Sequence, residues 1–129
     1  MIETVASIEL PADETLRIRK NRIEPKRLTG NEKRISIVTG IHGDELEGQY
    51  VCFELARRIG LQQEKLTGIV DIYPALNPLG IDSITRGIPA FDLDMNRLFP
   101  GHQDGNMTEF LASQIVRDLS GSVVALDIH

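Results

Sequence analysis

Ser36-Ile37-Val38-Thr39-Gly40-Ile41-His42-Gly43-Asp44-Glu45 is the stretch of sequence that predicts the fold. The apolar, β-branched run over 34–40 is typical of a strand buried inside a sheet. Apolar residues at helical spacing then predict a helix from Glu45 to Ile59, and Gly60 is expected to end it. Glycines at the turn between strand and helix allow the backbone to bend tightly. The polar end of the stretch therefore lies where ligands bind in open α/β sheets, beyond the carboxyl end of a strand.

The rest of the chain completes an α/β pattern. A long segment over 74–105 has no clear period and holds four of the six prolines, which is typical of a functional loop. The order strand–helix–strand–loop–helix–strand predicts a mostly parallel or mixed sheet with helices on both faces. The further elements expected are strands over 2–10, 15–23, 68–73 and 122–128, and a helix over 108–119.

Composition limits the class of protein. The chain has 129 residues and is 41% hydrophobic, which suits one domain with a real core. A net charge of -5 with a pI near 5.1 argues against nucleic-acid or anionic-membrane partners. The sequence shows no signal peptide and no apolar stretch long enough to span a membrane. The single cysteine, Cys52, is interpreted as a core residue, and a reducing, cytoplasmic setting fits best.

Two predicted strand ends carry possible metal ligands. His42 and Glu45 follow the strand over 34–40, and His129 follows the last strand. Two histidines and a glutamate, with a fourth position left for water, are typical ligands of a catalytic zinc ion. Asp127 is a candidate partner for the second ring nitrogen of His129, or a turn-former. The alternative interpretation is a solvated loop at one strand and a frayed terminus at the other.

The long loop carries possible substrate-binding residues. The pair Asn96-Arg97 is suited to hold a substrate carboxylate, and Arg86 to stabilise an oxyanion. Asp92 and Asp94 are expected to support the loop through hydrogen bonds to its backbone. The alternative is a polar surface loop with ordinary surface charges. The basic residues over 17–27 are interpreted as the solvent-exposed face of a strand pair, able to attract acidic substrates weakly.

Together these motifs resemble the succinylglutamate desuccinylase/aspartoacylase family, which has a zinc carboxypeptidase-like fold. The motifs occur in the family's order and extend over most of the chain from residue 35 onward. The resemblance rests on Gly40-Ile41-His42-Gly43-Asp44-Glu45, Asn77-Pro78-Leu79-Gly80, Arg86, Asp94-Met95-Asn96-Arg97-Leu98-Phe99-Pro100-Gly101, Thr108-Glu109 and Asp127-Ile128-His129.

The resemblance implies a role for each of these sites. His42, Glu45 and His129 would bind one zinc ion. Asn96 and Arg97 would bind the substrate carboxylate, and Arg86 would polarise the scissile carbonyl. The interval between Arg86 and Asn96 is longer than in the family's namesake deacylases. The family's general base is a glutamate beyond the third zinc ligand, so residues 1–129 are expected to be the amino-terminal part of the catalytic domain and inactive alone.

The expected function is a zinc-dependent deacylase that cleaves the amide bond of an N-acyl amino acid or a similar small acidic amide. Its partner would be a small molecule, with no nucleic acid and no membrane involved. A metallocarboxypeptidase acting on peptide C-termini would use the same residues. A non-catalytic α/β binding module is the alternative from a different class, and it predicts no zinc uptake.

Overall fold

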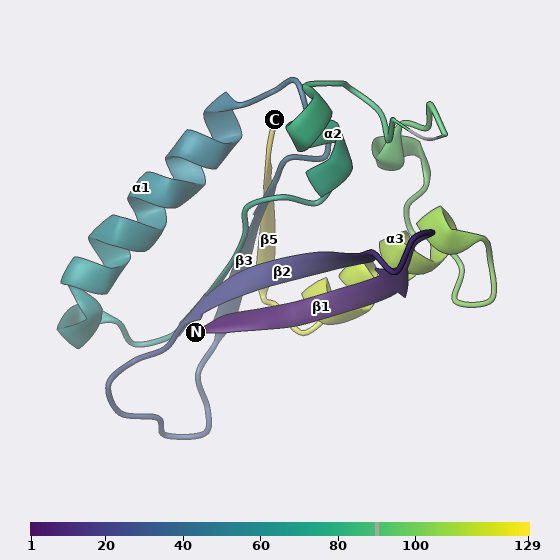
Figure 1. Cartoon of the computed structure of the whole chain (residues 1–129). Helices are drawn as coiled ribbons and strands as arrows, with labels where there is room; N and C mark the ends of the chain where they lie inside the picture. Colours follow the sequence, from purple (N-terminus) through teal and green to yellow (C-terminus); the bar gives the residue numbers. More distant parts are fainter. Residues whose placement is uncertain (90) are drawn as a thin grey trace.

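The computed structural model describes residues 1–89 and 91–129, which form an α/β fold around one mixed sheet (Figure 1). The strand order is β1-β2-β4-β3-β5. The parallel pairs are β3 with β4 and β3 with β5, whereas β2 is antiparallel to both β1 and β4. The elements are β1 Ile2–Glu9, β2 Thr15–Ile23, β3 Arg34–Thr39, α1 Glu47–Leu61, a 3-10 turn Gln63–Lys65, β4 Ile69–Tyr73, α2 Pro78–Ser83, a 3-10 turn Met95–Arg97, α3 Met107–Leu119 and β5 Val124–Ile128.

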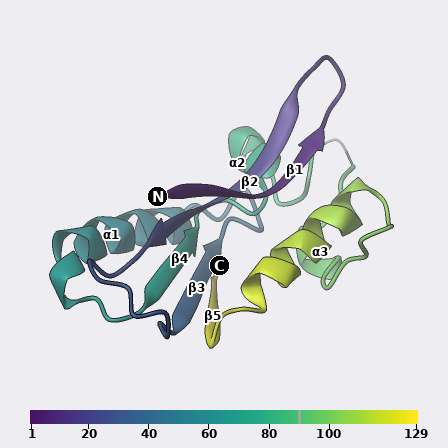
Figure 2. The same ribbon diagram turned by 90° about the horizontal axis from the view of Figure 1, so that it is seen from below.

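The sheet separates two hydrophobic clusters, as the pattern of helices on both faces predicts. One cluster packs α1 against the sheet and includes Cys52, Ile37 and Ile72. The other packs α3 under the β1–β2 hairpin and includes Ile18 and Ile115. Figure 2 shows α1 and α3 on either side of the strands. The expected α/β architecture with a mixed sheet and the core position of Cys52 are therefore confirmed.

Helix α1 differs from its predicted bounds at both ends. It begins at Glu47, so Glu45 lies in the preceding loop. There its carboxylate faces His42 and His129. It ends at Leu61, and Gly60 lies within the helix rather than after it. The expectation that Gly60 ends the helix was wrong. Gly60 does not adopt the positive φ of a glycine that ends a helix, and the last turn is instead closed by the Gln62 amide, which donates to the Ile59 carbonyl at 3.0 Å.

The basic segment over 17–27 is not one exposed face. Lys20 is only 4% exposed, and its amine lies 3.1 Å from Asp71 and 2.7 Å from Asp118. Arg22 forms two hydrogen bonds of 2.8 Å with Asp71. The expectation of a uniformly solvent-exposed face was wrong for these two residues. Alternation along β2 places them on the face that carries buried carboxylates.

The long loop contains more regular structure than its sequence indicated. Helix α2 starts at Pro78 and is capped by Asn77, whose side chain accepts a hydrogen bond from the Gly80 amide at 2.9 Å. A 3-10 turn over Met95–Arg97 follows, with Asp94 as its cap. No helix among the described residues is both long and apolar enough to cross a membrane.

Candidate metal centre

Strand pairing brings the two candidate ligand segments together. Because β3 and β5 are parallel, their carboxyl ends lie at the same edge of the sheet, with Thr39 beside Ile128. The loop after β3 carries His42 and Glu45, and His129 follows β5 directly. Figure 1 shows the C-terminus at that edge, next to α2. Residues more than 80 positions apart in sequence therefore share one site because of the parallel register.

The three predicted ligands converge. One possible ligand atom from each of His42, Glu45 and His129 lies within 4.8 Å of the other two. His42 Nδ1 is 3.1 Å from Glu45 Oε1, and His129 Nδ1 is 3.3 Å from Glu45 Oε2. The two imidazole rings are tilted by 55°, with their centroids 5.1 Å apart. Both rings thus present Nδ1 to the same carboxylate.

The opposite nitrogen of each ring faces a second carboxylate. His42 Nε2 lies 3.0 Å from Asp94 Oδ1, and His129 Nε2 lies 3.0 Å from Asp127 Oδ2. A neutral imidazole that donates its Nε2 proton to such a carboxylate keeps the Nδ1 lone pair free for a metal. The structure thus places Asp127 where a partner of His129 was predicted.

Asp94 has a contact that the sequence did not indicate. Its Oδ1 accepts a 3.0 Å hydrogen bond from the Asn96 amide, which is the expected loop support, and the same oxygen faces His42. Burial opposes ionisation of Asp94, but the bonds to His42 and Asn96, with the charge of Arg86, outweigh it and lower its pKa. Asp94 is therefore held as a carboxylate beside the imidazole. Its position two residues before the Asn-Arg pair was the only signal in the sequence.

The donor set fits a divalent metal. Glu45 Oε2 is buried and accepts no hydrogen bond of normal geometry from any described residue. A buried carboxylate oxygen left in this state costs free energy unless a cation satisfies it. Two imidazole nitrogens and one carboxylate are also the ligand types that zinc prefers. The residues present thus fit a zinc ion without rearrangement of the strands.

Arg86 lies at the rim of this cluster. One guanidinium nitrogen is 3.6 Å from Glu45 Oε1 and another is 3.6 Å from Asp94 Oδ2. The side chain is 54% exposed, so it also faces solvent. Asn96 and Arg97 are exposed on the next loop, and the guanidinium of Arg97 comes no nearer than 4.0 Å to the carboxylate of Asp94. Arg86 is thus at the cluster, whereas Arg97 makes no close contact there.

Close backbone packing fixes the loop that carries His42. Gly40 adopts a φ of +71°, which favours glycine, directly after β3. Gly43 packs on α2, where an added Cβ would lie 2.0 Å from the carbonyl carbon of Gly80. The loop between β3 and α1 therefore rests on α2, and a larger residue at Gly43 would force them apart.

Comparison with known proteins places this chain in a family. The sequence model of the succinylglutamate desuccinylase/aspartoacylase catalytic domain matches residues 31–129. An N-alpha-acetyl-L-2,4-diaminobutyric acid deacetylase from Halomonas elongata is 38% identical over 91 residues, which are 70% of this chain and 26% of that protein.

Solved structures agree with the sequence match. A succinylglutamate desuccinylase/aspartoacylase from Rhodobacter sphaeroides superposes with a TM-score of 0.82 and 30% identity, over 99% of this chain and 39% of that one. The product-bound ectoine utilization protein EutE (DoeB) from Ruegeria pomeroyi superposes with a TM-score of 0.79 and 29% identity, over 95% of this chain and 37% of that one. The chain spans less than half the length of these relatives. It belongs to the succinylglutamate desuccinylase/aspartoacylase family.

Proposed function

We propose that this chain carries the zinc site of a hydrolase that cleaves the amide bond of N-acyl amino acids. One observation carries the proposal. His42 and His129 both present Nδ1 to Glu45, while the Nε2 atom of each ring is held by a separate carboxylate. This arrangement orients both rings for metal binding before any ion arrives.

The chemistry expected of the site follows from its ligands. Zinc bound by two histidines and a glutamate supplies Lewis-acid chemistry and activates water at neutral pH. The hydrogen bonds that His42 and His129 donate from Nε2 to Asp94 and Asp127 would fix the tautomer of each histidine. The family resemblance implies a glutamate general base beyond the third zinc ligand, and that residue would take the proton from water.

Arg86 is the proposed oxyanion-stabilising residue. Its guanidinium lies at the rim of the cluster, where its ion pairs with described residues are the 3.6 Å contacts to Glu45 and Asp94, so its donors would remain available to a substrate oxygen. Asn96 and Arg97 are the proposed binders of the substrate carboxylate, because both are exposed on the loop next to Asp94. The forked guanidinium of Arg97 suits bidentate recognition of a carboxylate.

The proposed substrate is a small acylated amino acid. The relative from Halomonas elongata is named for deacetylation of N-alpha-acetyl-L-2,4-diaminobutyric acid. Such a molecule offers an amide carbonyl for Arg86 and a carboxylate for Asn96 and Arg97. We therefore propose N-acyl amino acids rather than peptides as the substrate class.

Metal content tests the proposed site. The purified protein should bind one zinc ion per chain and melt at a higher temperature with zinc than without it. His42→Ala should lose that ion. His102→Ala is the matched control, because His102 lies in an exposed turn outside the ligand cluster and should leave zinc binding unchanged. Equal zinc content in both variants, or a folded wild type without zinc, would contradict the site.

Product analysis tests the substrate class. Turnover should be assayed with this chain and with a form extended after His129 to the length of its relatives. Release of acetate from N-acetyl amino acids by the extended form supports a deacylase. Release of C-terminal residues from peptides instead would identify a metallocarboxypeptidase and reject the proposed substrate.

A further inference from the structure

A groove outside the metal centre lies between the β1–β2 hairpin and the segment that follows β4. Strand β4 pairs with β2 only along Asn21–Ile23, so the part of β2 over 15–20 projects past the end of β4 (Figure 2). The chain after β4 turns into α2 and forms the facing wall. The cavity measures about 590 Å³, a size typical of small-molecule sites.

Two arginines in this groove have no partner of opposite charge. Arg17 and Arg19 form no ion pair with any described residue, and the residues opposite them on β1 are Ser7 and Thr4. The cations on the other face of the same strand differ, since Lys20 and Arg22 both lie beside the buried carboxylate of Asp71. The positive charge of β2 is therefore neutralised on one face and left available on the other.

The groove also offers negative charge and apolar surface. Asp82 on α2 and Glu14 at the hairpin turn line it, and neither forms an ion pair with a described residue. Leucine and proline side chains, including Leu10, Leu79 and Pro74, supply hydrocarbon surface to the same groove. Charges of both signs thus border one cavity without satisfying each other.

We propose that this groove binds a free amino acid in its zwitterionic form. The guanidinium groups of Arg17 and Arg19 would donate to the carboxylate, and Asp82 would accept from the ammonium group. The apolar wall would contact an aliphatic side chain. A plain carboxylate would use only the arginines, and a plain amine only Asp82, so each half alone should bind more weakly.

L-leucine is the probe, with 4-methylpentanoate and 3-methylbutylamine as the corresponding molecules that lack the ammonium or the carboxylate group. Calorimetric titration of the purified protein should show saturable binding of L-leucine at low millimolar concentration. Both analogues should bind at least about tenfold more weakly, because each lacks one of the two charged groups that the groove would contact. Equal binding of L-leucine and 4-methylpentanoate, or no saturable binding of L-leucine, would overturn the proposal.

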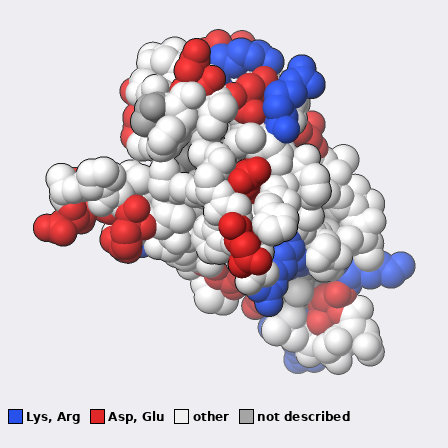
Figure 3. Space-filling model, turned by 90° about the vertical axis from the view of Figure 1, so that its right-hand side faces the viewer, with Lys and Arg blue, Asp and Glu red and all other residues white. Residues whose placement is uncertain are grey.

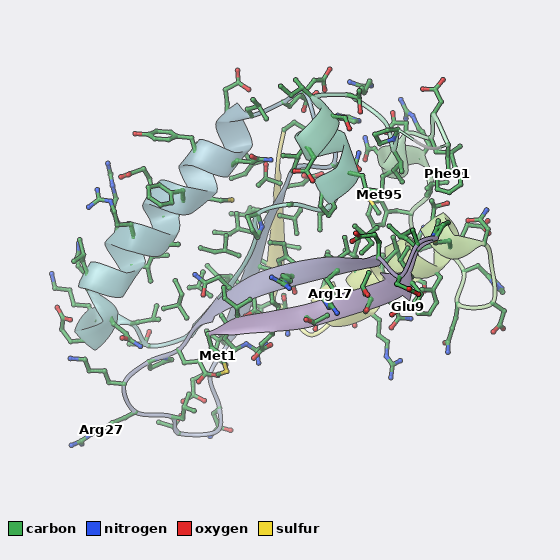
Figure 4. All side chains as sticks on the ribbon, viewed as in Figure 1. Met1, Glu9, Arg17, Arg27, Phe91 and Met95 are labelled. Carbon is green, nitrogen blue, oxygen red and sulfur yellow. The ribbon has the colours of Figure 1, made fainter. Side chains whose placement is uncertain are left out.

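Variants locate the binding site. Arg17→Gln and Arg19→Gln should each weaken L-leucine binding about tenfold. Arg27→Gln is the matched control, since it removes the same charge from a loop far from Arg17 (Figure 4). Asp82→Asn should weaken L-leucine binding and leave 4-methylpentanoate binding unchanged. If the control weakens binding as much as Arg17→Gln does, the effect is general electrostatics and the groove is not the site.

Discussion

At the scale of single residues, the candidate metal centre depends on carboxylates that do not themselves face the metal position. Asp94 and Asp127 each face the Nε2 atom of one histidine, at 3.0 Å. Partners of this kind fix the ring orientation and raise the basicity of the metal-binding nitrogen. Asp94 also supports its own loop, because its Oδ1 accepts a hydrogen bond from the Asn96 amide.

Asp94→Asn should weaken zinc binding by roughly 10- to 100-fold, because it removes the charge that holds His42 in the required tautomer. Competition with a chromophoric zinc chelator measures the affinity. Asp92→Asn is the control, since Asp92 is an exposed residue of the same loop with no contact to His42. Unchanged affinity in Asp94→Asn would show that the carboxylate does not act through His42.

Arg86→Met should lower kcat by about 10²- to 10³-fold while zinc content stays at one ion per chain, because an oxyanion donor is lost and the ligands remain. The extended form is assayed, with metal analysis on the same sample. Arg58→Met on the exposed side of α1 is the control for loss of one arginine. Loss of zinc together with activity would assign Arg86 a structural role at Glu45.

At the scale of elements, the site depends on how closely α2 approaches the loop after β3. In that loop, Gly40 adopts a positive φ, and the backbone at Gly43 leaves no room for a side chain. Helix α2 in turn leads directly to Arg86. A change in the separation of α2 and this loop would therefore displace both His42 and Arg86.

Gly43→Ala should reduce zinc affinity and destabilise the fold by about 1–3 kcal/mol, because the added Cβ would meet the backbone of Gly80. Urea unfolding and the zinc competition assay measure the two effects. Gly60→Ala is the matched control, since a Cβ at that position in α1 meets open space. It should stabilise the protein by about 0.5–1 kcal/mol and leave zinc affinity unchanged. Equal behaviour of the two variants would argue against the close approach.

At the scale of the whole molecule, one ionic network centred on a buried carboxylate joins β2, β3 and β4 to α3, and Glu3 on β1 lies at its edge, 3.5 Å from Lys20. Asp71 on β4 is fully buried and contacts Lys20 and Arg22 from β2 and Arg34 from β3. Lys20 extends the network to Asp118 on α3, which also accepts from Tyr73. Elsewhere, charges of both signs are interspersed with uncharged surface on the face shown in Figure 3. The buried charges therefore matter more to stability than those on that face.

The network makes stability depend on pH in one direction. Burial opposes ionisation of Asp71, but the hydrogen bonds and charges of Arg22 and Lys20 outweigh it and lower its pKa. A carboxyl with a lowered pKa in the folded state contributes stability above its unfolded pKa of about 3.9, and loses it as the pH falls below that value. Urea unfolding between pH 7 and pH 3 should show this loss.

Asp71→Asn should flatten the acidic limb of that profile. At neutral pH it should lower the free energy of unfolding by about 3–5 kcal/mol, because three cations lose a buried partner. Glu54→Gln is the control, since Glu54 forms ion pairs only along the exposed side of α1. An unchanged pH profile in Asp71→Asn would show that other carboxyls cause the acid sensitivity.

The sequence by itself determined the five strands, the two long helices and the residue types of the candidate site, but not helix α2. Strands, helices and strand ends follow from local periodicity, which is why His42, Glu45 and His129 could be placed at strand ends without coordinates. Long polar side chains carry no such period. For this reason the burial of Lys20 and the contact of Asp94 with His42 were not predicted from the pattern.

Only the tertiary structure decided which of these groups meet. The parallel register of β3 and β5 sets His129 beside Glu45, and the packing of α2 on Gly43 sets Arg86 at the rim. Neither relation is encoded within one helix or strand, since each joins segments that are far apart along the chain. Contacts between distant segments depend on strand order and side-chain packing, and both are properties of the folded molecule.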